Sequence, residues 1–377
     1  MKKMLIALLV TASVFFTLVL TIGNISKNQV DEFQVAMVTD FSDVNDASFN
    51  QACYEGAKEW CKKNNIKFNY YKPSGLSLAE RVKSLTLAID RGYDVILCPG
   101  FALGEPISIV APKHKNVQFI GLDITKSDFP EDFDFEENKN VVVYNYREEI
   151  AGYLAGYGAV KEGFRSLGYL GGMESAPVIK FGYGYIQGID AAAEELKTNV
   201  KVQHVYGGQF FGDGEIDKYI DNWYKSEDIK TEIVFACGGS IYTSVALAAK
   251  ENNGYMIGVD SDQTPIIDRD YKEGICITSA MKGIKQTVID KLELFFSDPE
   301  HFPEYNINNL GLVSSEHPEE NYVQLPLDTW RMKNFTIDDY KHLISEIMNG
   351  TKTVSDDIGK HPRLSEYTMV YYRGSIK

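Results

Sequence analysis

The sequence has few cysteines and no pattern that would pair them. They are Cys53, Cys61, Cys98, Cys237 and Cys276, an odd number without a CxxC spacing. Neither a disulfide framework nor a cysteine metal site is therefore expected. Each cysteine lies in or beside an apolar segment, which predicts small buried thiols. None precedes position 53, so the N-terminus has no cysteine that could carry a lipid.

Recognisable catalytic and phosphate-binding motifs are also missing. The six histidines are scattered without an HExxH pattern, no GxSxG elbow stands out, and GxxxxGK[ST] is absent. Gly182, Gly184 and Gly188 miss the GxGxxG spacing and lie within a helical stretch, so we interpret them as sites of close helix packing. No catalytic residue, metal site or cofactor is expected.

The chain has fewer basic than acidic residues, and this disfavours nucleic acid as the main ligand. The chain has 38 Lys and Arg against 53 Asp and Glu, a net charge of −15, so nucleic-acid phosphates would repel it. The rest of the composition, 44% hydrophobic and 24% charged, is typical of a globular protein. The 377 residues suffice for two domains of roughly 150 residues or more.

The chain begins with a long apolar run. Lys2 and Lys3 precede MLIALLVTASVFFTLVLTIG, residues 4–23, and this order is typical of a secretory signal. The run also reaches the roughly 20 residues that span a bilayer. Residues 1–28 are thus either a signal peptide or an N-terminal anchor. In both cases we expect an exported protein at the outer face of the plasma membrane or in the periplasm, with no lipobox cysteine.

From Phe33 onward, short apolar runs alternate with longer amphipathic stretches. Strands are expected at residues 34–40, 66–73, 93–100, 116–124, 140–146, 166–172, 201–208, 231–239, 255–260 and 276–282. Helices are expected at residues 48–64, 78–92, 104–115, 148–163, 178–196, 213–226, 241–254, 283–298 and 336–350. This βαβ spacing indicates an α/β protein with two doubly wound, Rossmann-like lobes.

No single linker separates the two lobes, so we expect crossover strands between them. One lobe would comprise residues 33–147 and about 283–312, and the other residues 148–282 and about 313–360. Residues 361–377 would form a C-terminal tail. Such an arrangement places a cleft between the carboxyl ends of the strands of both sheets, where ligands bind in open α/β folds.

Polar and aromatic groups suited to a ligand recur near the ends of the expected strands. They are Asp46, Phe49, Asn50, Asp123, Phe181, Gly238, Gly239, Asp260 and Lys282. Helix capping would account for Asp46 alone, but it does not account for Asn50 directly after Phe49. Together the set indicates a binding site in the cleft.

Five segments resemble the signature blocks of the BMP/PnrA family. They are AMVTDFSDVNDASFNQACYEGA, REEIAGYLAGYGAV, LGYLGGMESAPVIKFGYGYIQGI, FACGGSIYTSVALAAKENNGYMIGVDSDQ and ITSAMKGI, in family order from about residue 34 to about residue 355. The family comprises substrate-binding proteins of ABC transporters. The resemblance implies a type I periplasmic-binding-protein fold, capture of purine nucleosides, and ABC permease and ATPase subunits as partners.

The resemblance also implies how the base would be held. Phe49 and Phe181 would sandwich the flat ring between two aromatic faces. Asp46, Asn50 and Asp123 would form hydrogen bonds with its polar edge, because carboxylate and amide oxygens accept from ring and exocyclic N–H groups.

The same resemblance assigns the remaining site residues. Gly238 and Gly239 would let the backbone approach the ligand closely. Asp260 and Lys282 would hold the ribose hydroxyls. The stretch at residues 179–183 departs from many relatives, which bears on the choice among adenosine, guanosine, inosine and a pyrimidine nucleoside.

Two alternative functions would use the same pocket. One is a sensor tethered by residues 4–23 that signals to a membrane partner. The other is a nucleoside-processing enzyme such as a hydrolase. Cleavage of the N-terminus and the presence of neighbouring permease genes would separate a transporter component from a sensor, and release of free base would reveal an enzyme.

Overall fold

The computed structural model describes residues 33–40, 43–298, 302 and 306–377. The expected signal peptide or anchor at residues 1–28 lies outside these described residues. Within the described part of the chain, no helix combines the length and the hydrophobicity needed to span a bilayer.

The first lobe is built on a six-stranded parallel sheet. Its strands are β1 (Gln34–Val38), β2 (Lys67–Tyr71), β3 (Val95–Pro99), β4 (Gln118–Leu122), β5 (Val141–Tyr146) and β11 (Ile307–Leu310), in the order β11-β5-β4-β3-β1-β2. Helices α2 (Phe49–Lys63) and α10 (Ile284–Ser297) cover one face, and α3 (Leu78–Asp90) and α4 (Gly104–Val110) cover the other. Burial on both faces explains why β3 reads as an unbroken apolar run.

The second lobe is built on a seven-stranded sheet. Its strands are β6 (Ser166–Gly171), β7 (Val200–Tyr206), β8 (Ile233–Cys237), β9 (Tyr255–Asp260), β10 (Cys276–Lys282), β12 (Val323–Gln324) and β13 (Thr368–Ser375), in the order β12-β10-β9-β8-β6-β7-β13. Only β12 pairs antiparallel among them. Helices α5 (Glu148–Glu162) and α6 (Ala176–Leu196) pack on one face, and α11 (Ile337–Met348) packs against α5. Helices α7 (Gly214–Lys225), α8 (Tyr242–Asn252) and α9 (Thr264–Asp270) pack on the other.

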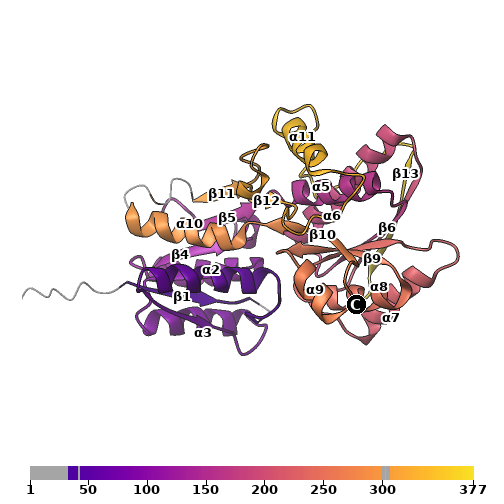
Figure 1. Cartoon of the computed structure of the whole chain (residues 1–377). Helices are drawn as coiled ribbons and strands as arrows, with labels where there is room; N and C mark the ends of the chain where they lie inside the picture. The colour runs from indigo at the N-terminus through magenta and orange to yellow at the C-terminus, as the bar shows by residue number, and fades with distance from the viewer. Residues whose placement is uncertain (1–32, 41–42, 299–301, 303–305) are drawn as a thin grey trace, which may run out of the picture.

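The described chain passes between the sheets three times, as Figure 1 shows. It leaves the first sheet after β5, returns between β10 and α10, and leaves again between β11 and β12. The sequence predicted two doubly wound lobes with crossovers between them, and this prediction is confirmed. One buried cluster continues through both lobes and includes Leu97 of the first and Ile257 of the second.

Helices α5 and α6 pack backbone to backbone, and glycine allows it. A Cβ atom at Gly184 would lie 2.0 Å from the carbonyl oxygen of Glu149, and one at Gly188 would lie 2.0 Å from that of Tyr153. No side chain fits at such a separation. The interpretation as helix-packing sites is confirmed for Gly184 and Gly188, whereas Gly182 lies against the side chains of Tyr169 and His204 in the sheet. The burial of all five cysteines as free thiols is also confirmed.

Four strands and helices were not expected from the sequence, and one of them is the two-residue strand β12. Strand β11 has alternating half-buried and exposed positions, and β13, from the segment expected as a tail, forms the outer edge of the second sheet beside β7. Edge strands face solvent on one side and therefore lack the apolar run that marks a central strand. Helix α9 has only seven residues, too few to show a helical period.

Candidate ligand-binding site between the lobes

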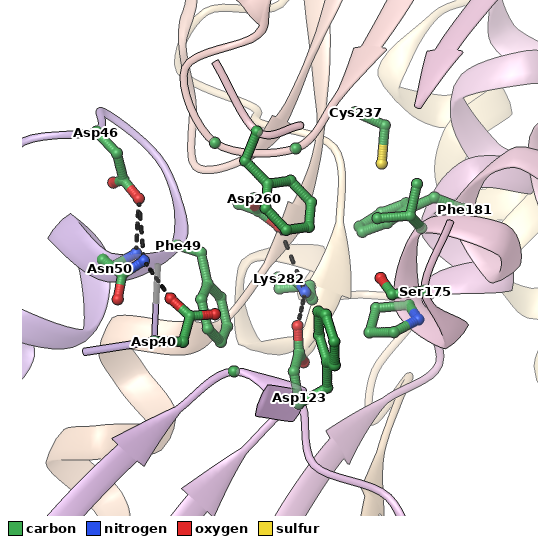
Figure 2. A pocket seen from close by; sticks show the side chains of 17 residues that line it. Asp40, Asp46, Phe49, Asn50, Asp123, Ser175, Phe181, Cys237, Asp260 and Lys282 are labelled. Carbon is green, nitrogen blue, oxygen red and sulfur yellow. Dashed lines mark hydrogen bonds and ion pairs between the residues drawn. The ribbon is translucent and has the colours of Figure 1, made fainter. Parts of the chain in front are cut away.

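A cavity lies between the two lobes, with about 540 Å³ of space not filled by protein atoms, its mouth included. All nine residues that the sequence predicted for the site line it. Figure 2 shows Phe49, Asn50 and Asp123 on the side of the first lobe, and Phe181 and Asp260 on the side of the second.

The turn that precedes α2 carries a carboxylate that both caps the helix and lines the cavity. Asp46 accepts hydrogen bonds from the backbone N–H groups of Ser48, Asn50 and Gln51 at 3.0–3.1 Å. The capping interpretation of Asp46 is therefore correct, although Ser48 holds the N-cap position itself. Because burial outweighs these hydrogen bonds, the pKa of Asp46 rises to about 6.

Asn50 is oriented by the two aspartates beside it. Its amide nitrogen donates to Asp40 and to Asp46 at 3.3 Å each. Its amide oxygen is buried and has no hydrogen-bond partner among the described residues. A buried acceptor without a donor costs free energy, so the first lobe presents an acceptor to whatever enters the cavity.

Two aspartates end strands β4 and β9 with backbone angles in the left-handed region. Asp123 has φ 55° and Asp260 has φ 64°. Asp tolerates this conformation better than most side chains, and such strain gathers at functional sites. One carboxylate oxygen of Asp123 is buried without a hydrogen-bond partner among the described residues. Asp260 accepts a hydrogen bond of 2.6 Å from Ser48 of the first lobe.

Lys282, at the end of β10, lies between the lobes. Its ammonium pairs with Asp123 of the first lobe and lies 3.4 Å from a carboxylate oxygen of Asp260 in the second (Figure 2). It also lies 4.9 Å from the ring centre of Phe49 and 5.4 Å from that of Phe181. Burial would lower the pKa of Lys282, but the surrounding carboxylates outweigh burial and raise it above its usual value.

Eight further residues line the cavity and were not among those predicted. They are Asp40, Gly100, Phe101, Ser175, Pro177, Val178, Phe210 and Cys237. Asp40 could have been included, because it is the last residue of the first expected strand. Phe210 lies in a loop whose path the sequence does not reveal.

Gly238 and Gly239, which directly follow β8, lie against Phe210. Gly238 has φ 129° and Gly239 has φ 50°, and a Cβ at Gly238 would lie 2.8 Å from the Phe210 ring. The pair thus makes room for an aromatic wall of the cavity. The close approach to a ligand implied by the resemblance stays a prediction.

The buried carboxyls give the protein a pH-dependent stability. Burial, together with the nearby carboxylates of Glu148 and Asp260, outweighs the opposing effect of Lys282 and raises the pKa of Asp123 to about 7. Asp46 and Asp123 therefore hold protons more tightly when folded than when unfolded, where their pKa is about 3.9. We expect the free energy of unfolding to fall by about 5 kcal/mol as pH rises from about 4 to about 7. Urea titrations across this range measure it.

The matched variant for this prediction is Asp123→Asn, which removes the carboxyl that titrates at the higher pH. Its free energy of unfolding should lose most of its slope between about pH 6 and pH 7.5 while keeping the slope near pH 5 that Asp46 supplies. A wild-type protein whose stability rises across this window would contradict the assignment of raised pKa values.

Comparison with known proteins identifies the family. The profile described as "ABC transporter substrate-binding protein PnrA-like" matches residues 33–328. The chain belongs to this family. It is accordingly a solute-binding protein of the ABC transporter class, and its family implies a solute ligand and transporter subunits as partners.

Individual relatives agree with this assignment. The "ABC transporter nucleoside-binding protein BmpA" of Lactococcus lactis subsp. cremoris is 28% identical over 69% of this chain and 74% of its own. An "uncharacterized lipoprotein" of Pyrococcus abyssi is 28% identical over 52% of this chain and 46% of its own.

A solved structure supports the fold. The crystal structure of an ABC transporter solute-binding protein from Aeropyrum pernix superposes with a TM-score of 0.64 at 19% identity, covering 87% of this chain and 88% of that one. The fold is that of type I periplasmic binding proteins, as the sequence resemblance implied.

Proposed function

We propose that this protein captures nucleosides, chiefly purine nucleosides, in the cavity between its lobes and delivers them to an ABC permease. The observation that carries the proposal is the pair of phenyl rings, Phe49 from one lobe and Phe181 from the other. They line a cavity whose buried acceptors have no partner in the part of the chain that the structure describes. The printed name of the Lactococcus relative, a nucleoside-binding protein, supports it.

The hydrogen-bond acceptors that line the cavity match the N–H donors on the edge of a nucleobase. The amide oxygen of Asn50 and one carboxylate oxygen of Asp123 are acceptors without donors among the described residues. Hypoxanthine, guanine and adenine each offer at least one N–H donor in the plane of the ring, and a base stacked on Phe49 and Phe181 would direct that donor sideways to these oxygens.

The ribose would lie against the charged pair from the second lobe. A carboxylate accepts from two adjacent hydroxyl groups, and an ammonium donates to their oxygens. Asp260 and Lys282 supply these groups 3.4 Å apart. Free ribose would leave the aromatic faces uncovered, so we expect weak binding of ribose or none.

The electrostatics of the cavity favour nucleosides over nucleotides. Four aspartates, Asp40, Asp46, Asp123 and Asp260, line the cavity, and Lys282 is the only basic residue among its lining residues. A phosphate dianion would be desolvated beside these carboxylates, and like charges repel. The ligand is therefore expected to be uncharged.

Calorimetric titration of the purified full chain tests the proposal. We expect inosine, guanosine or adenosine to bind, and the corresponding 5′-monophosphates to bind at least about a hundredfold more weakly, a difference of roughly 2.7 kcal/mol. If every nucleoside fails while another small solute binds, the proposed ligand is wrong.

The proposal includes export, attachment to the outer face of the membrane or release into the periplasm, and no catalytic turnover. Incubation with inosine should release no hypoxanthine at a catalytic rate. Such release would establish a nucleoside-processing enzyme. A cleaved N-terminus together with adjacent permease and ATPase genes would support the transporter component over a tethered sensor.

A further inference from the structure

A buried glutamate lies behind the proposed ribose site, outside the cavity. Glu148 is the first residue of α5, where the chain first crosses from one lobe to the other, and it is 1% exposed. One of its carboxylate oxygens lies 3.9 Å from the ammonium of Lys282. Glu148 is not among the residues that line the cavity, so the mechanism proposed above does not use it.

Glu148 has a second cationic neighbour from another element. Its other carboxylate oxygen lies 3.4 Å from the ammonium of Lys180 on α6, whose side chain is 18% exposed. Lys180 also donates to the backbone carbonyl of Tyr146 at 3.4 Å, directly before the crossover. Lys180 directly precedes Phe181 in the sequence. The side chains of Lys282, Glu148 and Lys180 therefore form a row of alternating charges that ends on α6, the helix that carries one stacking ring.

We propose that Glu148 is a positioning residue for Lys282: from the side away from the cavity, it holds the ammonium in the place where the ammonium meets the ribose, and it links that ammonium to Lys180. The inference rests on the proposed nucleoside function. Because Lys282 ends β10 just before the chain crosses back, the Glu148–Lys282 contact also ties two crossovers together.

Glu148 positions the Lys282 ammonium because it balances the attraction of the other two carboxylates. Asp123, Asp260 and Glu148 surround Lys282, and only Glu148 lies outside the cavity. With a neutral amide in its place, the Lys180 charge loses its nearest carboxylate, and its repulsion of Lys282 is no longer screened by a negative charge between them. The ammonium then moves toward Asp123 and Asp260 and occupies the oxygens that would otherwise accept from the ribose hydroxyls.

The test compares inosine with 2′,3′-dideoxyinosine, which lacks the two hydroxyls, in the full-length Glu148→Gln protein. For each protein, calorimetry gives the ratio of the dissociation constant of dideoxyinosine to that of inosine. We expect Glu148→Gln to weaken the binding of inosine about tenfold and the binding of dideoxyinosine less than about twofold. The ratio of the two dissociation constants then falls about fivefold or more. A general loss of structure would weaken both ligands alike.

Glu149→Gln is the matched control. Glu149 lies on the same helix with the same 1% exposure, but its partner is Arg147 at 2.8 Å rather than Lys282. This variant should keep the wild-type ratio. If Glu148→Gln fails to fold, as thermal unfolding would show, Lys180→Gln tests the same link. Without the Lys180 charge, Glu148 attracts Lys282 more strongly and draws its ammonium away from the ribose, so the ratio should again fall.

The outcomes separate the two proposals. Wild-type protein that binds no nucleoside overturns the proposed function. Wild-type protein that binds inosine, with a folded Glu148→Gln variant that keeps the wild-type ratio within about twofold, overturns the positioning role alone. Where Glu148→Gln does not fold, an unchanged ratio in Lys180→Gln overturns it equally.

Discussion

Replacing Lys282 with methionine is expected to abolish nucleoside binding, with a loss of at least about a hundredfold in affinity. Methionine keeps most of the side-chain volume but removes the charge. Asp123 and Asp260 would then face each other across the cavity without their shared cation, and breaking a buried pair in this way costs about 3–5 kcal/mol. Calorimetry with inosine measures the loss, and thermal unfolding without ligand measures the cost to the fold.

The control is Lys285→Met, three residues further along the chain. Lys285 pairs with Glu59 at 2.8 Å on the surface, and both side chains are about half exposed. Such pairs contribute about 0–1 kcal/mol, so this variant should bind inosine as the wild type does. A Lys282→Met protein that retains wild-type affinity would remove the ammonium from the site.

Replacing Phe49 with alanine is expected to weaken nucleoside binding by about 1–3 kcal/mol, the range seen when a stacking ring is removed. Phe49 is the better of the two rings for this test. Phe181 is 1% exposed and packs edge-on against Phe235 at 5.9 Å, so its removal would also disturb the core of the second lobe. Phe49 is only partly buried and lies at the first turn of α2.

Tyr54→Ala supplies the aromatic control on the same helix. The Tyr54 ring packs against Phe68 and Tyr70 at 5.6 and 5.4 Å and is not among the residues that line the cavity. Its removal should lower thermal stability without changing the inosine dissociation constant. Equal affinity losses in both variants would mean that Phe49 acts through the fold rather than through the base.

Much of the architecture could be predicted because local and global signals agree. Central parallel strands are buried on both faces, so β3 and β4 appear as apolar runs between amphipathic helices. The same geometry made the site predictable. The carboxyl ends of β4 and β9 both lie at the cavity between the sheets, because Asp123 directly follows β4 and Asp260 is the last residue of β9.

The rest depends on contacts between distant segments. Phe210 reaches the cavity from a loop that folds over Gly238, and nothing in its neighbouring residues marks that path. Glu148 looked like an ordinary acidic residue in the first turn of a helix. Its burial follows from packing against β10, which lies more than a hundred residues further along the chain.

A crystal structure of the protein grown with inosine tests the central claim most directly. We expect the base between Phe49 and Phe181, a ring N–H directed at Asn50 or Asp123, and the ribose hydroxyls at Asp260 and Lys282. An empty cavity at saturating inosine, or a nucleoside bound elsewhere on the protein, would contradict it.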